Sequence, residues 1–295
     1  MGDFETMKQA YSASSKILKK KMERERKADF QTLNQIMDNE IIIIRGTYDR
    51  IEDVFDILKI PYGLMEDYQF EGVNIRPTQT LIINCPGDGF SKKSLEKIKD
   101  FVKEGGFLLT TDWVLKNVLE KIFPDHVKFN EQSTRDDVVK VEIVDKSSPY
   151  LKGMFEKDAE PLWWLESTSY PIKILRPNDV KVLIQSREMK KKYGESPIVI
   201  TFNYEKGTVL HMTSHYYLQR TELRSDRHKK SAKEYAVEEM GLSKEEIAGD
   251  ADFDDLSLAE AESAYTSQQF IVNTMVERKK KVEKMEDEEE QSKED

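Results

Sequence analysis

Short apolar runs alternate with stretches of helical periodicity through the middle of the chain. Three short runs made up mainly of aliphatic and β-branched residues, typical of strands buried on both faces, lie within residues 40–45, 80–84 and 107–111. Apolar residues spaced as in helices follow these runs at residues 49–58, 91–102 and 113–122. Strands separated by helices of about 10 to 15 residues predict a parallel α/β sheet with right-handed crossovers.

The second half of the chain is richer in strand patterns. Strands are predicted at residues 138–144, 173–175 and 180–185, and a hairpin is predicted from residues 198–204 and 208–213. Further helices are expected at residues 231–240, where Gly241 ends the pattern, and at 257–281. Ser91 is expected to cap the helix that follows it.

The two ends of the chain differ from this α/β middle. Residues 1–38 contain no proline and place Met7, Tyr11, Leu18 and Met22 on one face of a mildly basic helical arm. Residues 283–295 include eight acidic residues and two lysines, which is typical of a disordered tail. We therefore divide the chain into a helical arm (1–38), an α/β domain (39–225), C-terminal helices (226–282) and an acidic disordered tail (283–295).

The composition indicates a soluble cytoplasmic protein. The chain has 295 residues, of which 38% are hydrophobic and 35% charged, and its longest apolar runs have only four residues, so we expect no membrane span. The single cysteine, Cys85, excludes an internal disulfide and a cysteine-cluster metal site. A formal net charge of −10 opposes nucleic-acid binding, although residues 190–192 and 220–230 form local basic patches.

Three glycine-containing motifs resemble a known family. They are Leu-Ile-Ile-Asn-Cys-Pro-Gly-Asp-Gly at residues 81–89, Gly-Gly-Phe-Leu-Leu-Thr-Thr-Asp-Trp at 105–113 and Gly-Thr-Val-Leu-His-Met-Thr-Ser-His at 207–215. With the segment 148–153, their order and spacing are similar to the class I glutamine amidotransferase-like superfamily, in particular its trehalose-utilisation-type branch. The resemblance implies a flavodoxin-like three-layer sandwich with a mostly parallel central sheet, extended by helices at both ends.

The resemblance also implies where catalytic residues would lie. Active members carry a cysteine at a sharp turn between strand and helix, with glycines two residues away on either side. Here that position is Asp112, with Thr110 and Val114 beside it. The histidine of the family is retained as His215, whereas its glutamate is replaced by Tyr217. Without the cysteine and the glutamate, the thiolate–imidazolium pair that attacks glutamine cannot form, and we expect no glutaminase activity.

A ligand cleft is expected where the carboxyl ends of the strands meet, as in other open α/β sheets. The candidate ligand-binding residues there are Cys85, Gly87, Asp88, Gly89, Trp113 and Tyr216. The pattern around Cys85 is that of a small core residue, and the glycine-rich loop lacks the Lys-Ser/Thr of a phosphate site. His211 and His215 are separated by about 13 Å along a strand, too far to share one ion, so we expect neither a metal nor a cofactor.

An aromatic pair, Trp163 and Trp164, stands in an extended segment. Because adjacent side chains of a strand point to opposite faces, one ring is expected in the core. The other is expected beside a cleft or an interface.

These observations lead to two main hypotheses of function. In the first, the chain is a non-catalytic amidotransferase-like domain that acts in protein interaction, ligand binding or assembly. The helical arm 1–38 and helix 257–281 would then dock a partner or a second copy of the chain, with Glu262 facing water. Packing of helix 257–281 on its own sheet is the competing interpretation. In the second, the chain is a hydrolase or lyase that uses Asp112 and His215, assisted by Tyr217. A nucleic-acid-binding role through the basic patches is a third, less favoured hypothesis.

Overall fold

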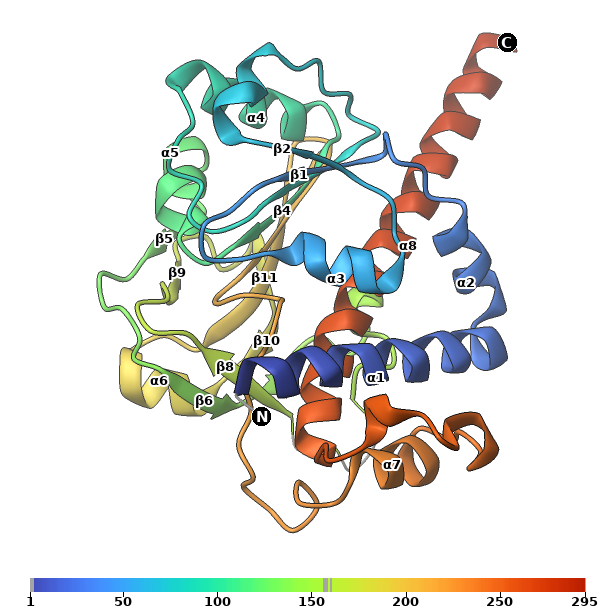
Figure 1. The fold of residues 1–295 in the computed structure, drawn as a ribbon. Helices are drawn as coiled ribbons and strands as arrows, with labels where there is room; N and C mark the ends of the chain where they lie inside the picture. The colour runs from blue at the N-terminus through green and yellow to red at the C-terminus, as the bar shows by residue number, and fades with distance from the viewer. Residues whose placement is uncertain (1–2, 156–158, 160, 295) are drawn as a thin grey trace.

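An eight-stranded sheet forms the centre of the computed structural model, which describes residues 3–155, 159 and 161–294 (Figure 1). Its strand order is β2-β1-β3-β4-β12-β11-β10-β7. Neighbouring strands are parallel from β2 to β12 and antiparallel from β12 to β7, which confirms the predicted mostly parallel sheet. In sheet order the strands span Gly63–Met65, Ile41–Ile44, Thr80–Ile83, Phe107–Thr111, Gly207–Met212, Pro197–Tyr204, Val180–Gln185 and Glu142–Ile143.

Two small ribbons lie outside this sheet. β5 (Val127–Phe129) pairs with β9 (Ile172–Ile174), and β6 (Asp137–Lys140) pairs with β8 (Leu162–Leu165). The single strand predicted at residues 138–144 is therefore wrong, because its first part belongs to a ribbon and its second part, β7, to the main sheet. The predicted hairpin is confirmed as β11 and β12.

Alternate residues of the central strands fill two separate cores, one on each face of the sheet. Ile43, Ile82 and Leu109 lie side by side across β1, β3 and β4 and belong to one core, whereas Ile44 and Leu108 belong to the other. Every residue of these three strands is buried. Burial on both faces explains why the strands are continuous apolar runs in the sequence.

Helices cover both faces of the sheet (Figure 1). The first core includes residues of α1, α3 and α8, and the second includes residues of α4 and the π turn η2 (Leu115–Leu119). Ser91 caps α4 as predicted, since its Oγ accepts a hydrogen bond of 3.1 Å from Ser94 N. The α-helices are α1 Asp3–Glu25, α2 Lys27–Asn34, α3 Ile51–Leu58, α4 Lys92–Lys103, α5 Glu120–Ile122, α6 Arg187–Tyr193, α7 Ala232–Glu234 and α8 Leu258–Glu294.

Short helical turns complete the described elements. The predicted helix 231–240 is divided into α7 and a second π turn, η4. The short turns span η1 Asp67–Gly72, η3 Pro149–Leu151, η4 Tyr235–Glu239, η5 Glu245–Ile247 and η6 Ala251–Phe253.

The two terminal helices belong to the core of the protein, which corrects the expectation that they dock a partner. α8 buries Tyr265, Val272 and Met275 in the first core, beside residues of α1. Gln268 is a polar residue buried among these apolar side chains, and its Nε2 donates a hydrogen bond of 2.9 Å to Tyr11 O. α8 packs on its own sheet, as the competing interpretation held.

Two further expectations about the C-terminal region need correction. Glu262, predicted to face water, is only 6% exposed, because Arg227 Nη2 lies 2.6 Å from its Oε1. The acidic segment after residue 282, predicted to be disordered, continues α8 as far as Glu294.

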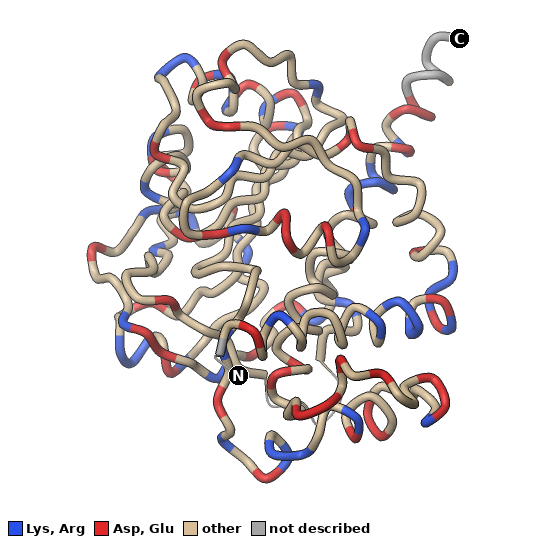
Figure 2. Tube along the Cα trace, viewed as in Figure 1, with Lys and Arg blue, Asp and Glu red and all other residues tan. Residues whose placement is uncertain are grey.

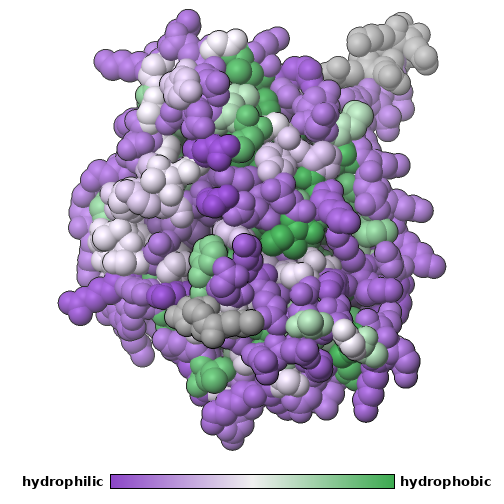
Figure 3. Space-filling model, viewed as in Figure 1, coloured by the Kyte–Doolittle hydropathy of each residue, from purple (hydrophilic) through white to green (hydrophobic). Residues whose placement is uncertain are grey.

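Basic residues at the surface often lie beside acidic ones. Lys16 of α1 lies 2.5 Å from Asp250 and 2.8 Å from Asp252. Figure 2 shows the acidic residues of the segment 250–255 next to α1. In the patch 220–230, Arg224 lies 2.9 Å from Glu188. On the face seen in Figure 3, hydrophobic residues form small, separate patches. Among the helices that the structure describes, none has the length and apolar composition needed to cross a bilayer.

Candidate functional site

Five polar side chains meet near the carboxyl ends of the central strands. Asp49, Cys85, Asp112 and His215 follow β1, β3, β4 and β12 respectively, and Glu166 follows β8. Because parallel strands end at the same edge of the sheet, segments far apart in the sequence bring these groups together. We call this group of five the cleft cluster.

Asp112 occupies a strained turn between β4 and η2. Its φ of +46° lies in the left-handed region, although it is not a glycine and both Thr110 and Val114 are fully buried beside it. The sharp turn therefore forms although residues 110 and 114, two positions away on either side, are not glycines. The Asp112 carboxylate accepts hydrogen bonds of 2.7 Å from Ser169 Oγ and Tyr170 N, and burial raises its pKa to about 6.

His215 is held by carboxylates on two sides. Its Nδ1 contacts Glu166 Oε2, and its Nε2 lies 3.7 Å from Asp112 Oδ2. Burial alone lowers the pKa of His215, but the charge of Asp49 and contacts with Cys85 and Glu166 together raise it well above its usual value. Among the described residues, Nε2 has no hydrogen-bond partner.

Cys85 is a buried residue, as predicted, but it is also part of the cleft cluster. Its backbone N donates to Thr111 Oγ1 at 3.1 Å, which fixes the loop after β3. Burial raises the pKa of the thiol to about 11, although His215 beside it acts in the opposite direction. The thiol is thus neutral at physiological pH and a weak nucleophile by itself.

A pocket of about 470 Å³ opens above His215 and Glu166. Its walls combine charged side chains with aromatic rings, among them Tyr48, Arg50, Trp164, Tyr217 and Arg220. Trp163 is 1% exposed and packs in the core while Trp164 lines the pocket, which confirms the expected division between the two rings.

Of the three predicted aromatic site residues Tyr217, Tyr216 and Trp113, Tyr217 alone lines the pocket. Tyr217 lines the pocket, but Glu166, and not residue 217, contacts His215 Nδ1. Tyr216 points away from the pocket and stacks on Phe270, with ring centroids 5.6 Å apart, so we no longer include it among the ligand-binding candidates. Trp113 does not line the pocket but stacks on Tyr170, and its ring centroid lies 5.1 Å from that of Tyr48, which does line it.

The glycine-rich loop does not reach the pocket. Gly87 has a φ of +63°, and a Cβ there would lie 3.2 Å from side chains of Ile83 and Val114, so the loop needs glycine for packing. Asp88 is exposed, and the N–H of Gly89 is already bonded to Asp67 Oδ2 at 3.0 Å. Of the loop 85–89, Cys85 alone joins the cleft cluster.

Sequence reasoning missed Glu166 and Asp49. Glu166 follows the Trp163–Trp164 pair, and its two-residue spacing from Trp164 places both on one face of an extended segment. That alternation is the one signal that could have identified it. Asp49 stands at the start of the predicted helix 49–58, where an acidic residue is common and carries no specific signal.

The sheet and its two helical layers define an α/β sandwich, and similarities to known proteins add to this description. No family model matches the chain. It is 31% identical over 81 residues to a YcgL domain-containing protein from Aliivibrio fischeri (strain MJ11), a match that covers 28% of this chain and 81% of that protein. Through this segment the chain belongs to the YcgL domain-containing proteins.

Two solved structures with some likeness to this chain are distant from it in sequence. One is a cytoplasmic protein from Salmonella typhimurium, with 12% identity and a TM-score of 0.44 over 60% of this chain and 88% of that one. Another is a putative ThuA-like protein from Bacteroides uniformis ATCC 8492, with 14% identity and a TM-score of 0.41 over 59% and 81% of the two chains.

Proposed function

We propose that the protein is an amidotransferase-like domain without glutaminase activity that binds a small polar ligand in the pocket above His215. The observation that carries this proposal is the pocket itself, whose volume of about 470 Å³ suits a small molecule. The residue at the turn after β4 is an aspartate bonded to Ser169 and Tyr170, and it is not a thiol directed at a substrate.

The charge of the pocket walls favours a neutral ligand rich in hydroxyl groups. Arg50 lies 3.1 Å from Asp53, and Arg220 lies 2.7 Å from Asp136, so the guanidinium groups are balanced by carboxylates. An anionic ligand would compete with these carboxylates. Hydroxyl groups, by contrast, can donate to carboxylates and accept from guanidinium groups at the same time.

Thermal-shift and calorimetric titration with neutral sugars and polyols, beside their phosphate esters, tests the proposal. A neutral compound should bind, and Trp164→Ala should weaken its binding about 10-fold through loss of the ring surface. Tyr68→Ala is the matched control, since that ring is 73% exposed and does not line the pocket. Tighter binding of the phosphate esters, or equal binding by Trp164→Ala, would contradict the proposal.

A hydrolase or lyase that uses Asp112 and His215 is a second candidate. It is favoured by the 3.7 Å separation of His215 Nε2 from Asp112 Oδ2 and by the absence of another hydrogen-bond partner for Nε2 among the described residues. A general base must lose its proton near neutral pH, and the raised pKa of His215 opposes this. If mass spectrometry showed that the protein converts a compound that it binds, the hydrolase or lyase would become the favoured function.

A further inference from the structure

Three members of the cleft cluster have the chemistry of a metal site. One ligand atom each from Cys85, Asp112 and His215 lies within 4.8 Å of the other two, and all three residues are buried. A cysteine sulfur, an imidazole nitrogen and a carboxylate oxygen are the three donor types that zinc uses in proteins. His211, whose distance from His215 spoke against a metal, is not one of the three, and Cys85 takes its place.

The environment of His215 is an independent observation that points to a ligand. The residue is 4% exposed, and its Nε2 faces Asp112 without a hydrogen-bond partner in the described part of the chain. Its other ring nitrogen contacts Glu166. In metal sites a carboxylate in this position fixes the ring and directs the free nitrogen to the ion.

The second ligand is oriented in the same way. Ser169 Oγ donates to Asp112 Oδ2 and Tyr170 N donates to Asp112 Oδ1, each at 2.7 Å, so both oxygens of this carboxylate are fixed by a hydrogen bond. The three candidate ligands come from loops after β3, β4 and β12, which are neighbours in the sheet. Each ligand lies within three residues of the end of its strand, so the sheet limits how far the three can move relative to one another, as a specific site requires.

Charge and access also favour a cation at this place. The carboxyl groups of Asp49, Asp112 and Glu166 and the thiol of Cys85 surround a single imidazole. A buried Oδ2 of Asp49 also lacks a hydrogen-bond partner among the described residues, and both Asp49 and His215 line the pocket. A divalent ion would offset this excess of acidic groups and would be reached from the pocket.

We propose that Cys85, Asp112 and His215 bind a zinc ion at the floor of the pocket. Three protein ligands leave a fourth tetrahedral position, which would face the pocket and accept water or a ligand group, as in zinc sites that exchange ligands. Glu166 acts as a positioning residue through His215. The zinc site shares His215 with the pocket of the proposed function, but Cys85 and Asp112 do not line that pocket.

Cobalt substitution of the tag-free, chelator-treated full chain tests this site. One Co²⁺ per chain should bind, with a near-ultraviolet thiolate-to-cobalt charge-transfer band that Zn²⁺ removes. Because Cys85 is the chain's single cysteine, this band reports on one site alone. Cys85→Ser should lack the band, and Glu166→Gln should bind about 10- to 100-fold more weakly.

His126→Gln is the matched control, because it also removes a buried histidine but one that packs against Phe123 and Phe202. It should leave the cobalt spectrum unchanged. Absence of the band in the wild-type protein, or its persistence in Cys85→Ser, would overturn the inference. If Cys85→Ser does not fold, the wild-type spectrum still decides, since the band requires a thiolate ligand.

The two proposals fail in different experiments. Loss of the cobalt band with normal binding of a neutral ligand would refute the zinc site and leave the proposed function intact. A normal band without binding of sugars or polyols, measured in zinc-loaded and zinc-free protein, would refute the proposed function and leave the zinc site intact.

Discussion

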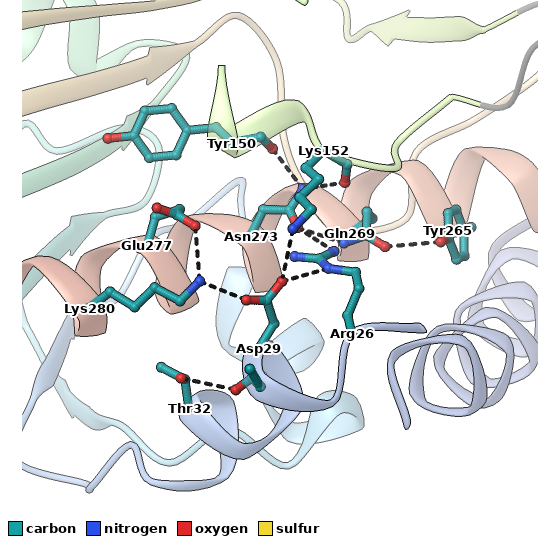
Figure 4. A network of polar contacts seen from close by, with 11 residues as sticks. Arg26, Asp29, Thr32, Tyr150, Lys152, Tyr265, Gln269, Asn273, Glu277 and Lys280 are labelled. Carbon is teal, nitrogen blue, oxygen red and sulfur yellow. Dashed lines mark hydrogen bonds and ion pairs between the residues drawn. The ribbon is translucent and has the colours of Figure 1, made fainter. Parts of the chain in front are cut away.

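Two buried aspartates, Asp29 and Asp112, meet opposite environments in this protein. Asp29 of α2 is 5% exposed, and Arg26 Nε and Lys280 Nζ lie 2.7 and 2.6 Å from its oxygens (Figure 4). Burial raises the pKa of Asp29, but the two cations outweigh it and lower the pKa to about 2. Asp112 is 2% exposed with His215 as its cationic neighbour, and burial raises its pKa to about 6.

The two sites differ in whether their buried polar atoms have hydrogen-bond partners. Beside Asp29, Asn273 makes hydrogen bonds of 2.7 to 3.0 Å with Arg26, Gln269, Tyr150 and Lys152, which joins α2, α8 and η3 (Figure 4). Within the described residues, the cleft cluster instead leaves polar atoms of Asp49 and His215 without partners. Buried groups are normally paired, so those left unpaired are candidates to receive a ligand.

The largest expected effect comes from breaking the Asn273 network. Asn273→Leu leaves the Arg26 and Gln269 donors and two backbone carbonyls without this partner, which should lower the free energy of unfolding by roughly 3 kcal/mol or more. Urea denaturation measures it. Asn34→Leu, at an exposed position of α2, is the control and should change stability by less than about 0.5 kcal/mol. Equal effects would mean that the network contributes nothing specific.

Asp29→Asn should cost about 2 kcal/mol at neutral pH. The folded-state pKa of Asp29, about 2, lies below the ordinary value of 3.8, so its contribution is present above pH 3.8 and is lost as the pH falls toward 2. The difference between the wild type and the variant should therefore shrink over this range in denaturation curves. A difference that grows on acidification would show that the sign is wrong.

Asp112→Asn should have the opposite effect from Asp29→Asn. The Asp112 carboxylate is buried and has a single cationic neighbour, His215. Removal of its charge should stabilise the chelator-treated protein by about 1 kcal/mol at neutral pH, as substitutions at functional sites often do. Thermal denaturation with calorimetry measures the change. If Asp112→Asn destabilised the protein as much as Asp29→Asn, the distinction between the two sites would be lost.

The smallest effect is expected at Lys152. Its Nζ lies 3.5 Å from Asp29 Oδ2, but its side chain is 60% exposed, so water screens the pair. Lys152→Ala should cost less than about 0.5 kcal/mol, because the backbone oxygen that accepts from Asn273 is retained. A loss as large as that of Asp29→Asn would mean that this exposed cation, rather than Arg26 and Lys280, stabilises the carboxylate.

The sequence predicted the parts of the fold that depend on local pattern. The runs of β1, β3 and β4, the cap at Ser91 and the hairpin of β11 and β12 all follow from neighbouring residues. The direction in which α8 packs does not. An apolar stripe on a helix has the same pattern whether it faces a partner or its own sheet, and Glu262 is buried through a distant arginine.

The candidate site was also predictable only in part, because some of its residues are brought together by contacts between distant parts of the chain. Asp112 and His215 were identified because the resemblance fixes their positions after strands. Glu166 reaches His215 from a different ribbon, 49 positions away in the chain, and no periodicity relates the two. The proximity of Cys85 to His215 depends on the order of β3, β4 and β12 in the sheet, which the sequence does not specify.

The packing of α1 against α8 has a consequence for how the chain is made. Gln268 and Tyr11, which share a hydrogen bond, are 257 positions apart. At the usual rate of translation, α1 waits on the order of tens of seconds on the ribosome before α8 emerges. During that time Met7, Tyr11 and Leu18 lack their neighbours from α8, and transiently exposed apolar surface of this kind favours aggregation. The packing of α1 against α8 is therefore completed only after α8 has been synthesised.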